Sequence, residues 1–196
     1  MTPSPARRAA ITGFRTPART LTVLALAAAG FAADSSALAS ASTTTARSDT
    51  PGRVCMFLAP EHVFGLGHVG WAYRWSDAQN WDFGSTTGST ASWHKSGAFA
   101  DVLKGFHDAP DSSGPYKSYR CRNTTGHDQA AAAAKADQVA AEPYDILTNN
   151  CLTRSLEIFE TYDTSGGLTS LGEGKLTAPR WYFEHDLDGF EPAAGL

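Results

Sequence analysis

A cysteine at the start of a predicted helix has the position of a nucleophile. Cys151 follows Asn149 and Asn150, one of which is expected to cap a helix, and the apolar stripe from Leu152 to Tyr162 predicts the helix itself. A thiol in the first turn faces unpaired backbone N–H groups and the positive end of the helix dipole, and both favour the thiolate. The same N–H groups can stabilise an oxyanion on an attacked carbonyl. The structural alternative is a small buried helix residue.

His68 is the histidine whose surroundings best suit a general base. Glycines at 65, 67 and 70 leave space around its ring. A histidine beside Cys151 would accept the thiol proton and later protonate a leaving group. Its structural alternative is a strand-end histidine bonded to the backbone. The sequence has no closely spaced Cys or His pair of the kind that holds a metal, so neither a metal nor a cofactor is expected.

A β-hairpin over residues 68–87 is predicted to position this histidine. Bulky apolar residues alternate with small or polar ones from 68 to 75, a period of two that is typical of a strand. Residues 76–80 are turn-like, and the expected register sets Trp75 opposite Trp81. This register gives one apolar face with Trp71, Tyr73, Phe83 and Ser85, and an opposite face with His68, Gly70, Asp82 and Thr86.

The rest of the chain predicts strands at 54–58 and around 119–122 and helices at 98–107, 129–142 and 180–187. Residues 1–39 are interpreted as a signal peptide, because arginines precede the apolar stretch 21–33 and Ala37-Leu38-Ala39 is a cleavage pattern. Cleavage near Ala39 would release a secreted protein with a disordered leader, 40–53, and a single domain, 54–196. The apolar stretch is shorter than the roughly 20 residues that span a bilayer, so no integral membrane segment is expected in the mature form.

Charge and cysteine usage narrow the function further. The net charge is −4, and removing residues 1–39 leaves 12 basic against 19 acidic residues. An acidic domain without a basic run is unsuited to phosphate backbones, so nucleic acid is excluded as a partner.

In an oxidising environment Cys55 and Cys121, both on strand-like runs, are predicted to form a disulfide, which leaves Cys151 as a free thiol. If Cys151 is in a disulfide instead, the sequence is interpreted as that of a structural protein stabilised by disulfides.

Two motifs together resemble a known superfamily. The segments Gly67-His68-Val69-Gly70-Trp71-Ala72-Tyr73 and Trp81-Asp82-Phe83-Gly84-Ser85 resemble the His-bearing hairpin of NlpC-type papain-like peptidases. The cysteine helix follows the hairpin here, which is similar to the circularly permuted branch that includes lecithin:retinol acyltransferase-like proteins. The resemblance implies an α+β papain-like core, in which an antiparallel sheet carrying His68 packs against the Cys151 helix. It also implies that Cys151 is the nucleophile and His68 the general base and acid.

In this superfamily a polar residue on the strand after the histidine orients the imidazole. Thr86 takes that role in the expected register, and Ser85 becomes the candidate if the turn shifts by one residue. Asp82 is more simply expected to form a cross-strand ion pair with Arg74.

The function that this resemblance implies is a secreted cysteine hydrolase or acyltransferase that acts on an amide or ester. Export makes a cell-wall peptide or a similar acyl compound the expected substrate. The alternative is a non-catalytic binding or toxin-like module whose aromatic surface comprises Trp71, Trp75, Trp81 and Trp93.

Overall fold

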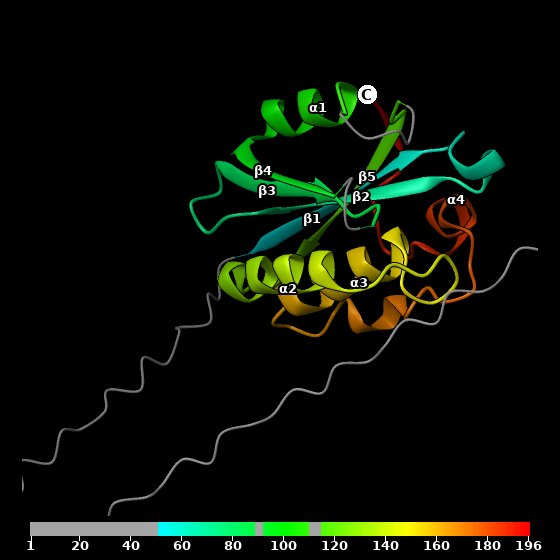
Figure 1. Cartoon of the computed structure of the whole chain (residues 1–196). Coiled ribbons are helices and arrows are strands. Elements are labelled where there is room, and N and C mark those ends of the chain that lie inside the picture. Colours follow the sequence, from blue (N-terminus) through cyan, green and yellow to red (C-terminus); the bar gives the residue numbers. More distant parts are fainter. Residues whose placement is uncertain (1–50, 89–91, 110–114) are drawn as a thin grey trace, which may run out of the picture. The chain divides into compact units, whose positions relative to one another are not determined.

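The computed structural model describes residues 51–88, 92–109 and 115–196 (Figure 1). Within these ranges the chain forms an antiparallel six-stranded sheet in the order β4-β3-β2-β1-β5-β6. Its strands are β1 (Gly52–Ala59), β2 (His68–Arg74), β3 (Asn80–Ser85), β4 (Trp93–Ala98), β5 (Ser118–Thr124) and β6 (Ala194–Gly195). The predicted α+β class is therefore confirmed. The predicted signal peptide and nearly all of the leader lie outside the described residues, and β1 begins two residues before the expected start of the domain.

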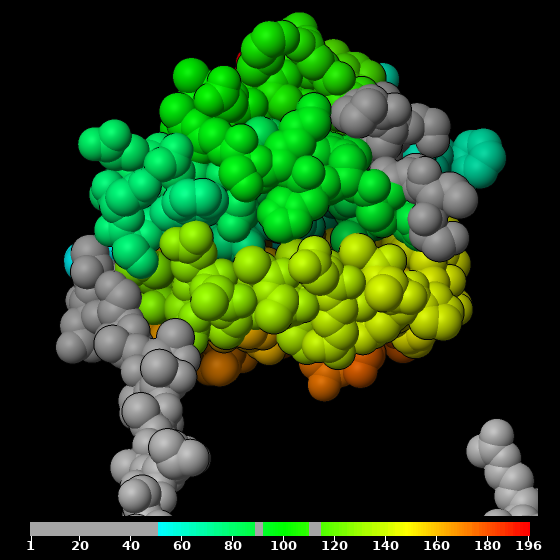
Figure 2. Space-filling model, turned by 60° about the vertical axis from the view of Figure 1, so that its left-hand side comes forward, coloured from blue at the N-terminus to red at the C-terminus, as the bar shows by residue number. Residues whose placement is uncertain are grey.

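Helices cover both faces of the sheet. Helix α1 (Phe99–His107) lies on one face, and α2 (Gln129–Ala141) and α3 (Cys151–Tyr162) lie on the other (Figure 1). Figure 2 shows α2 and the loop after it, in yellow-green to yellow, along one side of the green strands. A short helix α4 (Pro179–Trp181) continues as the π-helical turn η3 (Tyr182–Asp186). No helix in the described ranges is long and apolar enough to cross a membrane.

The core has two halves because the side chains of a strand alternate between faces. In β1, the residues Val54, Met56 and Leu58 belong to the cluster under α2 and α3, whereas Cys55, Phe57 and Ala59 belong to the cluster under α1. Phe57 stacks on Phe106 of α1 with their ring centroids 3.8 Å apart. The sheet is therefore buried on both sides rather than on one.

The hairpin register differs from the predicted one by one residue. Arg74 pairs with Trp81, and the backbone N–H of Trp75 donates to the carbonyl of Asn80, so the loop contains four residues instead of five. The side chain of Asp77 closes this loop by accepting the backbone N–H groups of Gln79 and Asn80, each at 2.9 Å. A shift of one residue turns every β3 side chain to the other face. The predicted faces are therefore wrong for β3.

Strand β4 was not predicted, because residues 87–114 have no clear alternation. It is the outer strand of the sheet, beside β3 and under α1, and its residues are half-buried or exposed. Outer strands are often short and polar, which protects the sheet edge but weakens the periodic signal.

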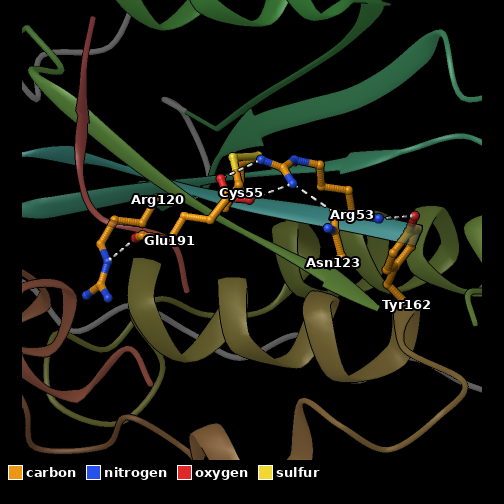
Figure 3. The surroundings of a disulfide bond; sticks show 7 residues. Arg53, Cys55, Arg120, Asn123, Tyr162 and Glu191 are labelled. Carbon is orange, nitrogen blue, oxygen red and sulfur yellow. Dashed lines mark hydrogen bonds and ion pairs between the residues drawn. A yellow bond between two sulfur atoms is a disulfide. The ribbon is translucent and has the colours of Figure 1, made fainter. Parts of the chain in front are cut away.

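The predicted disulfide between Cys55 and Cys121 is present and joins β1 to β5. The two residues are directly opposite each other, with their Cα atoms 4.1 Å apart. Figure 3 shows that Arg53, on the same strand, bonds to Asn123 of β5 and to Glu191 near the carboxyl end. This part of the sheet is therefore cross-linked covalently and by charged hydrogen bonds.

Candidate active site

The helix that carries Cys151 begins as predicted, and the structure identifies its cap. Asn150 accepts the backbone N–H groups of Leu152 at 2.9 Å and Thr153 at 3.2 Å through its Oδ1 atom. The Thr153 hydroxyl in return accepts the N–H of Asn150. Asn149 instead donates to the carbonyl of Pro143. Both asparagine side chains are thus used in local structure.

The Cys151 thiol is free, as predicted, and only 2 % of the residue is exposed. The backbone N–H groups of Val69 and Leu152 and the hydroxyl of Tyr144 act as hydrogen-bond donors to the sulfur. Burial nevertheless dominates and raises the pKa of the thiol to about 11. The expectation that the helix end would favour the thiolate is therefore wrong for the resting protein, because loss of solvation outweighs the N–H donors.

The hydrogen bond from Val69 joins the two segments that the sequence motifs single out. Val69 is the residue after His68 at the start of β2, whereas Cys151 opens α3, and α3 packs against β2. A backbone donor from the histidine strand thus contacts the sulfur. The N–H of Leu152 is already bonded to the Asn150 side chain in the helix cap.

The imidazole of His68 is buried and bonded to Ser85. Its Nε2 atom lies 2.7 Å from the Ser85 hydroxyl. By strand alternation His68 shares the α1 face with Gly70 and Ala72, and its ring centroid lies 6.1 Å from that of Tyr116. The Cys151 side chain packs in the other cluster, on the α3 face. The structure therefore brings the strand that carries His68 to the sulfur. The imidazole lies on the α1 face of this strand, and the thiol lies on the α3 face.

Ser85, not Thr86, is the residue that the structure bonds to His68. In the observed register Ser85 is opposite Gly70, so it shares a face with His68 and is its diagonal neighbour. The Thr86 hydroxyl is buried and forms no hydrogen bond within the described part of the chain. The one-residue shift of the turn therefore exchanges the two candidates.

The expected ion pair between Asp82 and Arg74 is not formed. The same shift places Asp82 opposite Tyr73, where it accepts a hydrogen bond from Ser96 and lies 3.7 Å from His94. Burial acts to raise the pKa of Asp82, but hydrogen bonds from His94 and Ser96 outweigh it and hold the pKa below its usual value. Asp82 thus ties β3 to β4.

Two residues near the thiol were not found from the sequence. Tyr144 lies in the loop between α2 and α3, and its hydroxyl interacts with both the sulfur and the backbone N–H of Cys151. Arg154 is fully buried and lies over the Tyr144 ring, 5.2 Å from its centroid. It donates to the Glu142 carbonyl at 2.8 Å and to the Asn149 side chain at 3.0 Å. Arg154 therefore holds this loop against α3. In the sequence, the only signal for Tyr144 was that it is a single aromatic residue between two predicted helices.

Other expectations concerned metals and aromatic surfaces. The described residues contain no cluster of three or more His, Cys, Asp or Glu side chains that could hold a metal ion. Trp71 and Trp81 are buried in the core, so the tryptophan surface of the alternative interpretation is not formed.

No protein-family model matches the chain, and neither the curated proteins nor the solved structures give a match.

Proposed function

We propose that the protein is a secreted cysteine hydrolase or acyltransferase that acts on an amide or ester, with a permuted papain-like arrangement of strand and helix. The observation that carries this proposal is that α3 packs against the histidine strand, with the Cys151 sulfur at the start of α3 beside the backbone N–H of Val69. The bond between His68 and Ser85 orients the imidazole on the α1 side of the strand that lies beside the sulfur.

In the proposed reaction the Cys151 sulfur attacks the carbonyl carbon while the thiol proton passes to His68. The N–H group of Val69 stabilises the oxyanion. Collapse of the tetrahedral intermediate breaks the bond to the leaving amine or alcohol, which takes the proton from His68. Water or another acceptor then attacks the thioester and releases the acyl group. This route requires the imidazole to come within hydrogen-bond reach of the sulfur at the start of β2.

Acylation by p-nitrophenyl acetate tests the proposal directly. We expect one equivalent of p-nitrophenol to be released in a burst, with the acetyl group found on Cys151 by mass spectrometry. Cys151→Ala should abolish the burst, and His68→Ala should slow it by about 10²- to 10⁴-fold.

His107→Ala is the matched control, because the His107 side chain is exposed on α1 and bonds to the neighbouring Asp108. It should leave the burst rate unchanged. Acetylation of Cys151 at the same rate in the His68→Ala and wild-type proteins would remove the histidine from the mechanism. No acetylation at all would refute the enzyme proposal and favour a binding module.

A further inference from the structure

An apolar cavity of about 260 Å³ lies beside the candidate active site. The β1–β2 loop with η1 (Val63–Gly65), the loop before α3 and the segment before α4 meet at one end of the sheet and form it (Figure 1). The apolar side chains that line it are Val63, Leu66, Ile146, Leu147, Leu176 and Pro179.

The position of the cavity connects it to the proposed chemistry. Gly67 and Asn150 also line it, and they immediately precede His68 and Cys151 in the chain. A group bound in the cavity would therefore lie next to the backbone of both proposed catalytic residues. The volume is below the roughly 300 to 1,000 Å³ of pockets that enclose a whole drug-sized ligand, so the cavity is suited to one group of a larger substrate.

The residues that line the cavity disfavour the binding of a charged group. None of the described residues that line it is charged, and the polar side chains among them are those of Asn150 and Thr177. The Asn150 amide is committed to the helix cap and to the Ile146 carbonyl, to which it donates at 2.8 Å. The Thr177 hydroxyl donates to the Lys175 carbonyl. A charged group placed here would lose its water without gaining a partner.

Several apolar side chains that line the cavity are exposed to solvent, and two lining residues have unfavourable backbone conformations. Packing within the fold does not account for either feature. Ile146, Leu147 and Leu176 are 56 %, 57 % and 76 % exposed. Val63 and Leu176 adopt left-handed backbone conformations, with φ of 47° and 61°, which are unfavourable for branched side chains. Strained backbone and exposed apolar side chains gathered around one cavity are typical of a binding site.

These strained segments are held in place by the backbone. The N–H of Leu176 donates to the Leu147 carbonyl at 2.9 Å, which joins the segment before α4 to the loop before α3. The N–H of Arg180 donates to the Leu66 carbonyl at 2.9 Å, which joins α4 to the β1–β2 loop. These two hydrogen bonds therefore join the three walls of the cavity to one another.

We propose that this cavity binds an uncharged aliphatic group of the substrate, either a short acyl chain or an aliphatic peptide side chain, next to the carbonyl that Cys151 attacks. The inference rests on the proposed function. It narrows the substrate to compounds that are apolar at this position, in contrast to peptides that carry a charged side chain there.

Acylation rates of Cys151 with matched p-nitrophenyl esters test the inference. Hexanoate should acylate at least about tenfold faster than acetate, because added methylene groups gain binding in the cavity. N-acetyl-leucine ester should likewise exceed N-acetyl-glutamate ester by at least about tenfold. If hexanoate is the better of the two apolar esters, the group is an acyl chain, and if the leucine ester is better, it is a peptide side chain. Equal rates for the acetate, hexanoate, leucine and glutamate esters would overturn the inference.

A pair of variants locates the effect. Leu147→Asp places a carboxylate in the cavity wall and should remove the preference for hexanoate over acetate. Phe64→Asp is the control, because Phe64 is a fully exposed apolar residue of the adjacent η1 that does not line the cavity. It should keep the preference. Equal loss in both variants would show that the cavity does not hold the chain.

A binding measurement separates failure of this inference from failure of the enzyme proposal. Hexanamide should bind to the Cys151→Ala protein in ligand-observed NMR, and the Leu147→Asp change should abolish that signal. If no ester acylates Cys151 but hexanamide still binds in this way, the cavity is a binding site and the proposed chemistry is wrong. If hexanamide binds equally with and without Leu147→Asp, or does not bind, the cavity inference is wrong whatever the esters show.

Discussion

The buried thiol should make the folded protein less stable at alkaline pH. Burial raises the pKa of Cys151 from an ordinary 9.0 to about 11, so between these values the unfolded chain loses the thiol proton while the folded protein keeps it. The stabilising contribution is fully present below pH 9 and is lost as the pH rises through 11. At about pH 10 the ratio of folded to unfolded protein should have fallen tenfold through this group, which is about 1 kcal/mol.

Urea unfolding followed by tryptophan fluorescence measures this contribution when the wild type is compared with Cys151→Ser. The serine does not titrate in this range, so the loss of stability between about pH 7.5 and 10 should be smaller in the variant by about 1 kcal/mol. Buried tyrosines whose pKa is also raised, such as Tyr162, are common to both proteins and cancel in the difference. Non-reducing electrophoresis verifies that the disulfide has not exchanged. An equal loss in both proteins would refute the reasoning that the Cys151 thiol is desolvated.

Three further changes should test the fold around the site. Ser85→Ala removes the hydroxyl that bonds the buried Nε2 of His68 and should cost about 1 to 3 kcal/mol in urea unfolding; an unchanged midpoint would show that the bond contributes nothing. Gly70→Ala places a Cβ atom against the Phe106 ring and should cost about 1 to 3 kcal/mol, part of which Phe106→Leu should restore in the double variant. Replacing both disulfide cysteines with alanine opens a link across 66 residues and should lower stability by about 4 kcal/mol, and a variant as stable as the wild type would contradict that estimate.

The elements with strong local signals were predictable from the sequence. Helix α3 has a cap, an apolar stripe and a glycine-rich end, and it lies where its pattern predicts. The β2–β3 hairpin was recognisable because its bulky residues recur with a period of two. The pairing of Cys55 with Cys121 followed from their place on strand-like segments, and the structure sets them directly opposite each other.

The features that could not be predicted depend on contacts between distant segments. The hairpin register depends on how Asp77 closes its loop, and alternation alone fits two registers that differ by one residue. Both faces of β2 are buried because α1 packs on the glycine-bearing face, which in the sequence has only small or polar residues. The contact of Tyr144 with Cys151 depends on the path of a loop that Arg154 holds in place.

The same distant contacts decide how the proposed reaction must begin. A thiol with a pKa of about 11 is almost entirely protonated at neutral pH, so a preformed thiolate cannot be the resting nucleophile. The proton must therefore leave the sulfur as the carbonyl is attacked, which gives the His68–Ser85 pair a role during the reaction rather than before it. A cavity that positions the apolar part of a substrate beside Cys151 would serve this mechanism, because attack then depends on placement of the carbonyl more than on the free thiolate concentration.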